Sequence, residues 1–194
     1  MSGRRRWAGV KQTAKRMALL GGLAIVGFGL AACSTLGSRH PVGNRVVPEP
    51  GKPVDLQRYL GRWYEIARYE QRFQKGCEGV TADYSLRDDA SIEVLNRCRK
   101  PDGTISDARG RAKVVDTATG AKLKVSFFGP FYGDYWVLDR DDDYRWSIVG
   151  EASGRYLWLL HREATPPEDD VQRLIERAGE LGYDTTMLRR TQQP

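Results

Sequence analysis

The sequence predicts an all-β fold, a barrel or sandwich of short antiparallel strands joined by hairpins. Apolar and polar residues alternate in eight segments, which span 62–69, 80–86, 91–97, 107–115, 121–128, 134–139, 144–150 and 155–162. Turn-forming residues such as Pro101-Asp102-Gly103 and Gly129-Pro130 stand between these segments. Short strands at such regular spacing are typical of barrels and sandwiches.

A single helix is expected after the eighth strand. Thr165-Pro166-Pro167-Glu168 has the sequence of a capping box with proline at the first helical position. One helical face then carries the apolar residues Val171, Leu174, Ile175, Ala178 and Leu181, and Gly182 is placed to end the helix. Because one amphipathic helix cannot bury its apolar face alone, we expect it on the outside of the sheet, followed by a ninth, edge-pairing strand over 185–190.

The charge balance argues against a nucleic-acid binder. The 194-residue chain is 40% hydrophobic and 29% charged, as expected of one globular domain. Its net charge is +6, but six of its 31 basic residues lie in the first 32 residues, where no acidic residue occurs. The other 25 basic residues face 25 acidic ones, so the rest of the chain is neutral and lacks a basic footprint for nucleic acid.

Residues 1–32 have the organisation of a secretory signal peptide. Basic residues between Arg4 and Arg16 precede the apolar stretch 17–30, and the small residues Ala31 and Ala32 follow. The alternative is a permanent transmembrane helix. It is less favoured because a spanning helix needs about 20 predominantly apolar residues, whereas this stretch is rich in glycine.

Leu30-Ala31-Ala32-Cys33 resembles the lipobox of bacterial lipoproteins, in which the cysteine is lipidated and becomes the first mature residue. The resemblance implies an acyl anchor on Cys33. It also implies outer-membrane delivery, since Ser34 replaces the aspartate that commonly signals inner-membrane retention. The alternative is a cysteine that happens to follow a cleavage site. Residues 33–53, which are rich in proline and poor in apolar residues, are expected to form a flexible tether before a folded domain at 54–194.

Gly61 and Trp63 on the first expected strand resemble the Gly-x-Trp signature of the lipocalins, and Arg162 at the end of the eighth resembles its partner arginine. In that family the tryptophan closes the barrel floor and the arginine packs across its ring. The runs similar to bacterial outer-membrane lipocalins in particular are 62–67, 80–86 and 124–133. The resemblance implies an eight-stranded antiparallel up-and-down lipocalin barrel with one C-terminal α-helix packed outside and a short ninth strand.

Cys77 and Cys98 are expected to form a disulfide. They lie 11 residues before and 10 residues after Asp88, the expected tip of a hairpin, so they come close together on adjacent strands. An exported protein folds in an oxidising compartment, which favours the bond. The alternative is a pair of buried free thiols.

The sequence contains no convincing catalytic or metal-binding arrangement. His40 lies in the tether and His161 is alone near a strand end, so no nucleophile–histidine pair is indicated. Asp139, Asp141 and Asp143 share the spacing of a calcium loop, but the glycine and glutamate that such a loop needs are missing. The sequence therefore favours binding over turnover, with no cofactor and no metal.

The resemblance to the lipocalin calyx also assigns the residues that face the interior. An eight-stranded barrel encloses enough space for one small ligand, and alternate residues of each strand face that space. The expected ligand-binding residues are Ala82, Tyr84, Val94, Asn96, Ala112, Val114, Val125, Phe127, Tyr135, Val137, Ile148, Tyr156 and Trp158. Each is equally compatible with a filled barrel core.

As a whole, the resemblance implies an outer-membrane-anchored carrier or store of a fatty acid or lysophospholipid that serves envelope lipid maintenance. Its expected partners are the lipid ligand and the membrane that holds the acyl anchor, and its expected assembly is a monomer or homodimer. Two alternatives stay open: a lipocalin-like enzyme that acts on a bound lipid or isoprenoid, and a structural envelope lipoprotein with a filled barrel.

Overall fold

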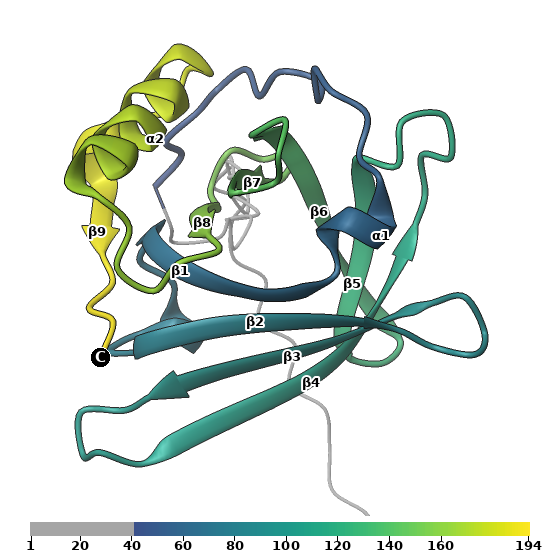
Figure 1. Cartoon of the computed structure of the whole chain (residues 1–194), viewed down its shortest axis with the longest axis horizontal. Helices are drawn as coiled ribbons and strands as arrows, with labels where there is room; N and C mark the ends of the chain where they lie inside the picture. Colours follow the sequence, from purple (N-terminus) through teal and green to yellow (C-terminus); the bar gives the residue numbers. More distant parts are fainter. Residues whose placement is uncertain (1–40) are drawn as a thin grey trace, which may run out of the picture. The chain divides into compact units, whose positions relative to one another are not determined.

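The computed structural model describes residues 41–194, so the predicted signal peptide and Cys33 lie outside the described residues. The strands, drawn as arrows in Figure 1, are β1 (Gly61–Tyr69), β2 (Glu78–Leu86), β3 (Ile92–Arg99), β4 (Ile105–Val114), β5 (Lys122–Phe128), β6 (Phe131–Arg140), β7 (Trp146–Gly150), β8 (Leu157–His161) and β9 (Leu188–Arg190). The helical segments are α1 (Leu56–Tyr59), α2 (Glu168–Glu180) and the 3-10 turns η1 (Arg72–Gln74) and η2 (Thr185–Met187).

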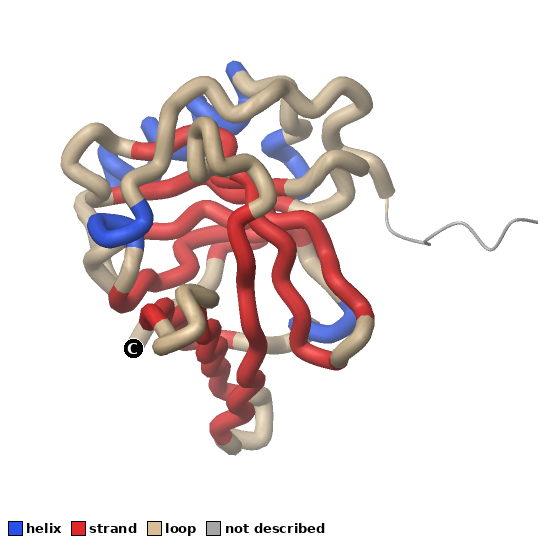
Figure 2. Tube along the Cα trace, turned by 90° about the vertical axis from the view of Figure 1, so that its right-hand side faces the viewer, coloured by secondary structure: helices blue, strands red, loops and turns tan. Residues whose placement is uncertain are grey.

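Strands β1 to β8 form the predicted barrel. Each strand from β2 to β8 pairs antiparallel with its neighbours in sequence, and β1 pairs with both β2 and β8, which closes the sheet. Long strands curve around one another and the helical segments lie at the periphery (Figure 2). This up-and-down order places the loops 70–77, 100–104, 129–130 and 151–156 at one end, which we call the mouth. The opposite end, where β1 begins, is the floor.

The barrel wall is apolar on both faces in β6, β7 and β8. Val137 and Val149 belong to the cluster that fills the barrel interior. Leu138 and Ile148, one residue away along each strand, belong to a second cluster that includes Leu174 of α2. Side chains alternate between the two faces of a strand, so the helix covers the outer face of these strands, as predicted (Figure 1).

The apolar face of α2 is confirmed, but the predicted capping box is wrong. The helix begins at Glu168, and its N-cap is Pro167, which has extended backbone and makes no side-chain capping bond. Thr165 lies in a bend before the helix, since proline disfavours helical conformation in the residue that precedes it. Glu168 and the next two aspartates instead favour the positive end of the helix dipole. Within residues 41–194, no helix is long and apolar enough to cross a membrane.

The predicted ninth strand is shorter than expected. Thr185–Met187 forms a 3-10 turn, and only Leu188–Arg190 pairs as β9, antiparallel to Ala67–Tyr69 of β1. The segment therefore adds to the end of β1 beyond the part that pairs with β2.

The flexible tether predicted up to residue 53 is wrong for part of that segment, because several of its residues are bound to the domain. The Gly43 amide donates to the carbonyl of Gly154 (3.0 Å), and the Asn44 side chain donates to the carbonyl of Leu181 (2.9 Å). Lys52 donates to the carbonyl of Arg140 (3.0 Å). A polar segment that lacks apolar periodicity predicts free chain, yet its hydrogen bonds hold this one against the barrel.

The floor is closed by the expected contact between Trp63 and Arg162. Trp63 is completely buried, and the guanidinium of Arg162 lies 3.8 Å from its ring centroid. Arg162 also donates to the carbonyls of Arg62 (2.7 Å), Arg58 (2.8 Å) and Leu60 (2.9 Å). One cation therefore satisfies the carbonyls where α1 turns into β1 while it covers the tryptophan ring.

We predict that Trp63→Ala destabilises the barrel by about 3–5 kcal/mol, as for other large core truncations. Arg162→Ala should cost about 1–3 kcal/mol, because it leaves part-buried carbonyls without donors. The matched control is Arg145→Ala, which removes only an exposed ion pair with Asp141 and should cost less than about 1 kcal/mol. Urea unfolding followed by circular dichroism measures all three, and wild-type midpoints for Trp63→Ala and Arg162→Ala would contradict the structural role of the pair.

Candidate binding site inside the barrel

Most of the residues expected to line the ligand site do lie in the barrel interior. The interior cluster contains Ala82, Tyr84, Val94, Ala112, Val114, Val125, Phe127, Tyr135, Val137 and Trp158. Asn96 faces the same side, since it pairs directly with Ala82 across β2 and β3. Tyr156 precedes β8 at the mouth and stacks on Trp158 with ring centroids 5.8 Å apart.

Ile148 was wrongly assigned to the interior. It packs on the outer face with Leu174 of α2, and Val149 faces inward in its place. The register of β6 and β7 shifts between Val137 and Asp139, where β6 contains a bulge. Since β7 is apolar on both faces, its sequence does not alternate between apolar and polar residues. The sequence therefore does not show which residues of β7 face the interior.

A chain of hydroxyl groups crosses the interior, and the sequence alone did not predict it. The Tyr59 hydroxyl lies 3.0 Å from both the Ser147 and the Tyr135 hydroxyls, and the Tyr135 hydroxyl lies 2.9 Å from that of Tyr84. Burial raises the pKa of Tyr59 to about 12 and raises the pKa values of Tyr84 and Tyr135 as well. The three phenols therefore stay neutral at physiological pH and satisfy one another. Tyr59 reaches the site from α1, a helix too short for apolar periodicity to indicate.

Solvent access differs among the side chains that face the interior. Trp63, Val137 and Val149 are completely or almost completely buried. Phe127 and Trp158 face the same interior but are only partly buried. Phe127 and Trp158 therefore keep some contact with solvent although they face the interior.

The ladder between β4 and β5 is short and ends well before the mouth. This strand pairs with β5 only from Arg111 to Val114, so residues 105–110 are hydrogen-bonded to β3 alone. Ala108, which pairs with Asn96 on the inward-facing side, is exposed. The Oδ1 atom of Asn96 is buried and has no hydrogen-bond partner within the described residues. This oxygen is an acceptor available to a bound molecule, and a buried acceptor without a donor is costly.

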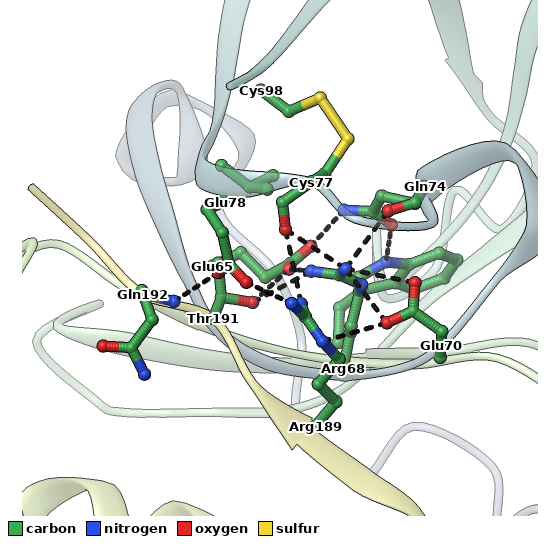
Figure 3. Close-up of polar contacts among 12 residues, drawn as sticks. Glu65, Arg68, Glu70, Gln74, Cys77, Glu78, Cys98, Arg189, Thr191 and Gln192 are labelled. Atoms are coloured by element: carbon green, nitrogen blue, oxygen red, sulfur yellow. Dashed lines mark hydrogen bonds and ion pairs between the residues drawn. A yellow bond between two sulfur atoms is a disulfide. The ribbon is translucent and has the colours of Figure 1, made fainter. Parts of the chain in front are cut away.

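A buried ion pair holds the opposite side of the mouth (Figure 3). Arg68 is completely buried, and its guanidinium donates to Glu65 at 2.6 Å. It also donates to the backbone carbonyls of Gln74 (3.1 Å) and Cys77 (3.2 Å), which belong to the β1–β2 loop. Gln74 in turn accepts a hydrogen bond from the Trp158 indole at 3.1 Å, so the network ties the loop to the lining of the site.

The C-terminal segment completes this side of the wall. β1 pairs with β2 only from Gly61 to Tyr64, after which the two strands separate. The Thr191 amide donates to the carbonyl of Ile66 (2.9 Å), and Gln193 donates to the carbonyls of Glu65 (2.8 Å) and Val80 (3.0 Å). Residues after β9 thus bridge the two strands where their own ladder ends.

The predicted disulfide is confirmed. Cys77 and Cys98 are bonded, with Cα atoms 5.3 Å apart, at the mouth ends of β2 and β3. The bond fixes the end of the β1–β2 loop to the neighbouring strand, next to the carbonyl that Arg68 binds.

The acidic residues whose spacing resembles a calcium loop are bound by cations instead. Asp139 accepts from Arg177 at 2.6 Å, and Asp141 accepts from Arg145 at 3.1 Å. Among residues 41–194, no three His, Cys, Asp or Glu side chains come together to hold a metal ion.

Removing the cation of the buried pair is predicted to destabilise the protein strongly. Arg68→Met leaves the Glu65 carboxylate buried without its partner and should cost about 3–5 kcal/mol. The double variant Glu65→Gln, Arg68→Met should recover most of this loss, because no buried charge remains. The control is Arg62→Met on the same strand, which removes a half-exposed pair with Asp83 and should cost less than about 1 kcal/mol. Chemical unfolding measures these differences, and a double variant no more stable than Arg68→Met would contradict the explanation.

A family model described as a lipocalin-like domain matches residues 54–193. The chain is 42% identical over 172 residues to the outer membrane lipoprotein Blc of Escherichia coli K12, which covers 88% of this chain and 94% of that protein. It is 40% identical over 151 residues to temperature-induced lipocalin-1 of Arabidopsis thaliana, covering 73% and 81% of the two chains. The structure of insecticyanin from Manduca sexta superposes with a TM-score of 0.64 at 19% identity, covering 79% of this chain and 88% of that chain, which supports the fold.

Proposed function

Because this chain belongs to the lipocalin family, we propose that it binds one fatty acid or lysophospholipid in the barrel and carries or stores it at the outer membrane. The apolar chain of the ligand lies among the interior side chains between the mouth and the hydroxyl chain of Tyr59, Tyr84 and Tyr135. Its polar head lies near the mouth, where water has access. The protein acts by reversible burial of the ligand rather than by a chemical step.

The observation that carries this proposal is the partly accessible apolar interior. Val125, Phe127 and Trp158 face the barrel interior yet keep some exposure to solvent. A binding site of this kind combines apolar walls with a few polar groups that orient the ligand. The unpaired Asn96 Oδ1 and the tyrosine hydroxyls are such groups. Both features favour an accessible interior over a filled one.

The proposed location rests on the leader and on the relatives. The lipobox ending at Cys33 would supply an acyl anchor, and several acyl chains on one cysteine give stable attachment where a single chain binds only marginally. The relatives from Escherichia coli and Vibrio cholerae are named outer membrane lipoproteins. We therefore propose outer-membrane attachment through Cys33.

The wild-type protein is expected to bind a fatty-acid probe saturably. A chain of about sixteen carbons gains up to about 0.8 kcal/mol per buried methylene, some 12 kcal/mol in total. Lost translational freedom and chain ordering cost at least about 4 kcal/mol. The remaining ~8 kcal/mol corresponds to a dissociation constant of about 1 μM. Fluorescence titration of the delipidated full chain with a fluorescent fatty acid measures it.

Trp158→Ala is expected to weaken this binding about tenfold or more, because the indole contributes apolar contact that is worth more than about 1.4 kcal/mol. The matched control is Trp146→Ala, since Trp146 packs against the outer cluster beneath α2 and should leave the affinity unchanged. No saturable binding by the wild type to any fatty acid or lysophospholipid would refute the proposal and favour a filled barrel. Tighter binding by Trp158→Ala would likewise show that the indole fills the core.

Replacing Cys33 is expected to abolish membrane attachment. Cys33→Ala removes the residue that would carry the acyl chains, so the protein should appear in the soluble fraction or remain incompletely processed. Membrane fractionation with immunoblotting measures the distribution. A Cys33→Ala protein that sediments with the outer membrane like wild type would overturn the lipobox interpretation.

A further inference from the structure

Large apolar side chains are exposed on three separate mouth loops or their flanking strand ends. Phe128 and Phe131, on either side of the β5–β6 turn, are 81% and 78% exposed. Phe73 in η1 is 67% exposed, and Ile105 at the start of β4 is 64% exposed. Soluble proteins rarely expose several large apolar side chains together unless that surface meets a partner or a membrane. We call these four residues the mouth rim.

The charge of the loops differs between the two ends of the barrel. The four mouth loops (70–77, 100–104, 129–130 and 151–156) contain four basic and three acidic residues, a net charge of +1. The floor loops (87–91, 115–121 and 141–145) contain two basic and six acidic residues, a net charge of −4. An anionic surface would therefore attract the mouth and repel the floor, which orients the barrel as it approaches.

A cavity of about 410 Å³ next to the rim adds a second cationic feature. It lies between the turn before β2, the β3–β4 turn and the C-terminal residues, and its lining includes Arg99 and Lys100. The Lys100 ammonium lies 3.3 Å from the Cys77 sulfur, and no carboxylate pairs with Arg99 or Lys100 among the described residues. Arg189, also in the lining, is neutralised by Glu70 and Glu78. Glu78 lies opposite Arg99 in the β2–β3 ladder and Asp102 attracts Lys100, but neither carboxylate forms an ion pair with these cations, so both can meet an external anionic group.

We propose that the mouth rim docks on an anionic lipid surface, with Phe73, Phe128 and Phe131 entering the interfacial region and Arg99 and Lys100 facing lipid phosphates. Phenylalanine rings gain by leaving water for the acyl-chain boundary, and each Lys or Arg near an anionic bilayer adds to the attraction. The charge argues for lipid rather than a second copy of this chain, because two mouths facing each other would bring like charges together. Docking would place the mouth of the barrel against the lipid phase.

Docking of the mouth rim is tested with an environment-sensitive fluorescent amino acid. It replaces Phe131 in the full chain, and in the matched control it replaces Leu86. Leu86 is 51% exposed at the floor end of β2, so both positions tolerate substitution without loss of core packing. The proteins are mixed with phosphatidylcholine vesicles that contain about 30% phosphatidylglycerol as the anionic lipid. A nitroxide-labelled lipid in the same vesicles quenches any probe that reaches the bilayer. This measurement requires no ligand in the barrel, so it can fail or succeed independently of the proposed function.

We expect the nitroxide to quench the probe at position 131 several-fold more than the probe at position 86. Arg99→Gln, Lys100→Gln should weaken the vesicle contact of the mouth about fivefold per charge removed, and about 1 M salt should weaken it in the wild type as well. The matched charge control is Arg87→Gln on a floor loop, which should leave the quenching unchanged.

Equal quenching at the two positions, or none at position 131, would overturn the proposal. A change of the position-131 signal that appears without vesicles and grows with protein concentration would also overturn it, since that result identifies a second copy of the chain as the partner of the rim. Quenching unaffected by the Arg99 and Lys100 substitutions would refute the role of these cations.

Discussion

The guanidinium of Arg162, stacked on Trp63 at 3.8 Å, holds the closed end of this barrel together, and the rest of the structure depends on that closure. The same group binds carbonyls at the junction of α1 and β1, so it fixes the angle at which the chain enters the barrel. Tyr59, at the end of α1, is held beneath the ring because the Trp63 indole donates to its carbonyl at 2.9 Å. Its hydroxyl can then start the hydrogen-bonded chain that crosses the interior. The contacts among Arg162, Trp63 and Tyr59 therefore both close the floor and position the first hydroxyl group of the interior.

The mouth is held by buried polar contacts rather than by a stacked cation and ring. There β1 and β2 separate, and buried polar groups replace the missing ladder: Arg68 and Glu65 bind the β1–β2 loop and the C-terminal segment together. Removing two charges from water is costly, so such a pair is weak evidence for stability, but it strongly penalises any arrangement that breaks it. The pair thus specifies the position of the loop on one side of the mouth. On the other side, residues 105–110 have no ladder partner in β5, so buried polar contacts fix one edge of the entrance and main-chain pairing is missing at the other.

The outer and inner faces of the barrel wall have different roles. The outer face of β6, β7 and β8 is sealed by α2 and its apolar cluster, which supplies a packed core away from the ligand. The inner face can consequently leave side chains such as Phe127 and Trp158 partly exposed without sacrificing the fold. The outer cluster therefore adds packed apolar area that does not depend on how tightly the interior is filled.

The sequence by itself determined the strands, the apolar face of the helix, the disulfide and the floor pair, because each depends on local alternation or on a short motif. It also placed ten of the thirteen expected lining residues in the interior cluster. Tertiary structure alone decided the rest. Ile148 faces α2 because a bulge in β6 shifts the register and because β7 is apolar on both faces, so no alternation marks its inner side. Residues 43 and 44 are held by carbonyls more than a hundred positions away, and Tyr59 enters the site from a one-turn helix. Periodicity reports which residues share a face, whereas the choice of face and the contacts between distant segments arise only when the sheet closes and the helix packs against it.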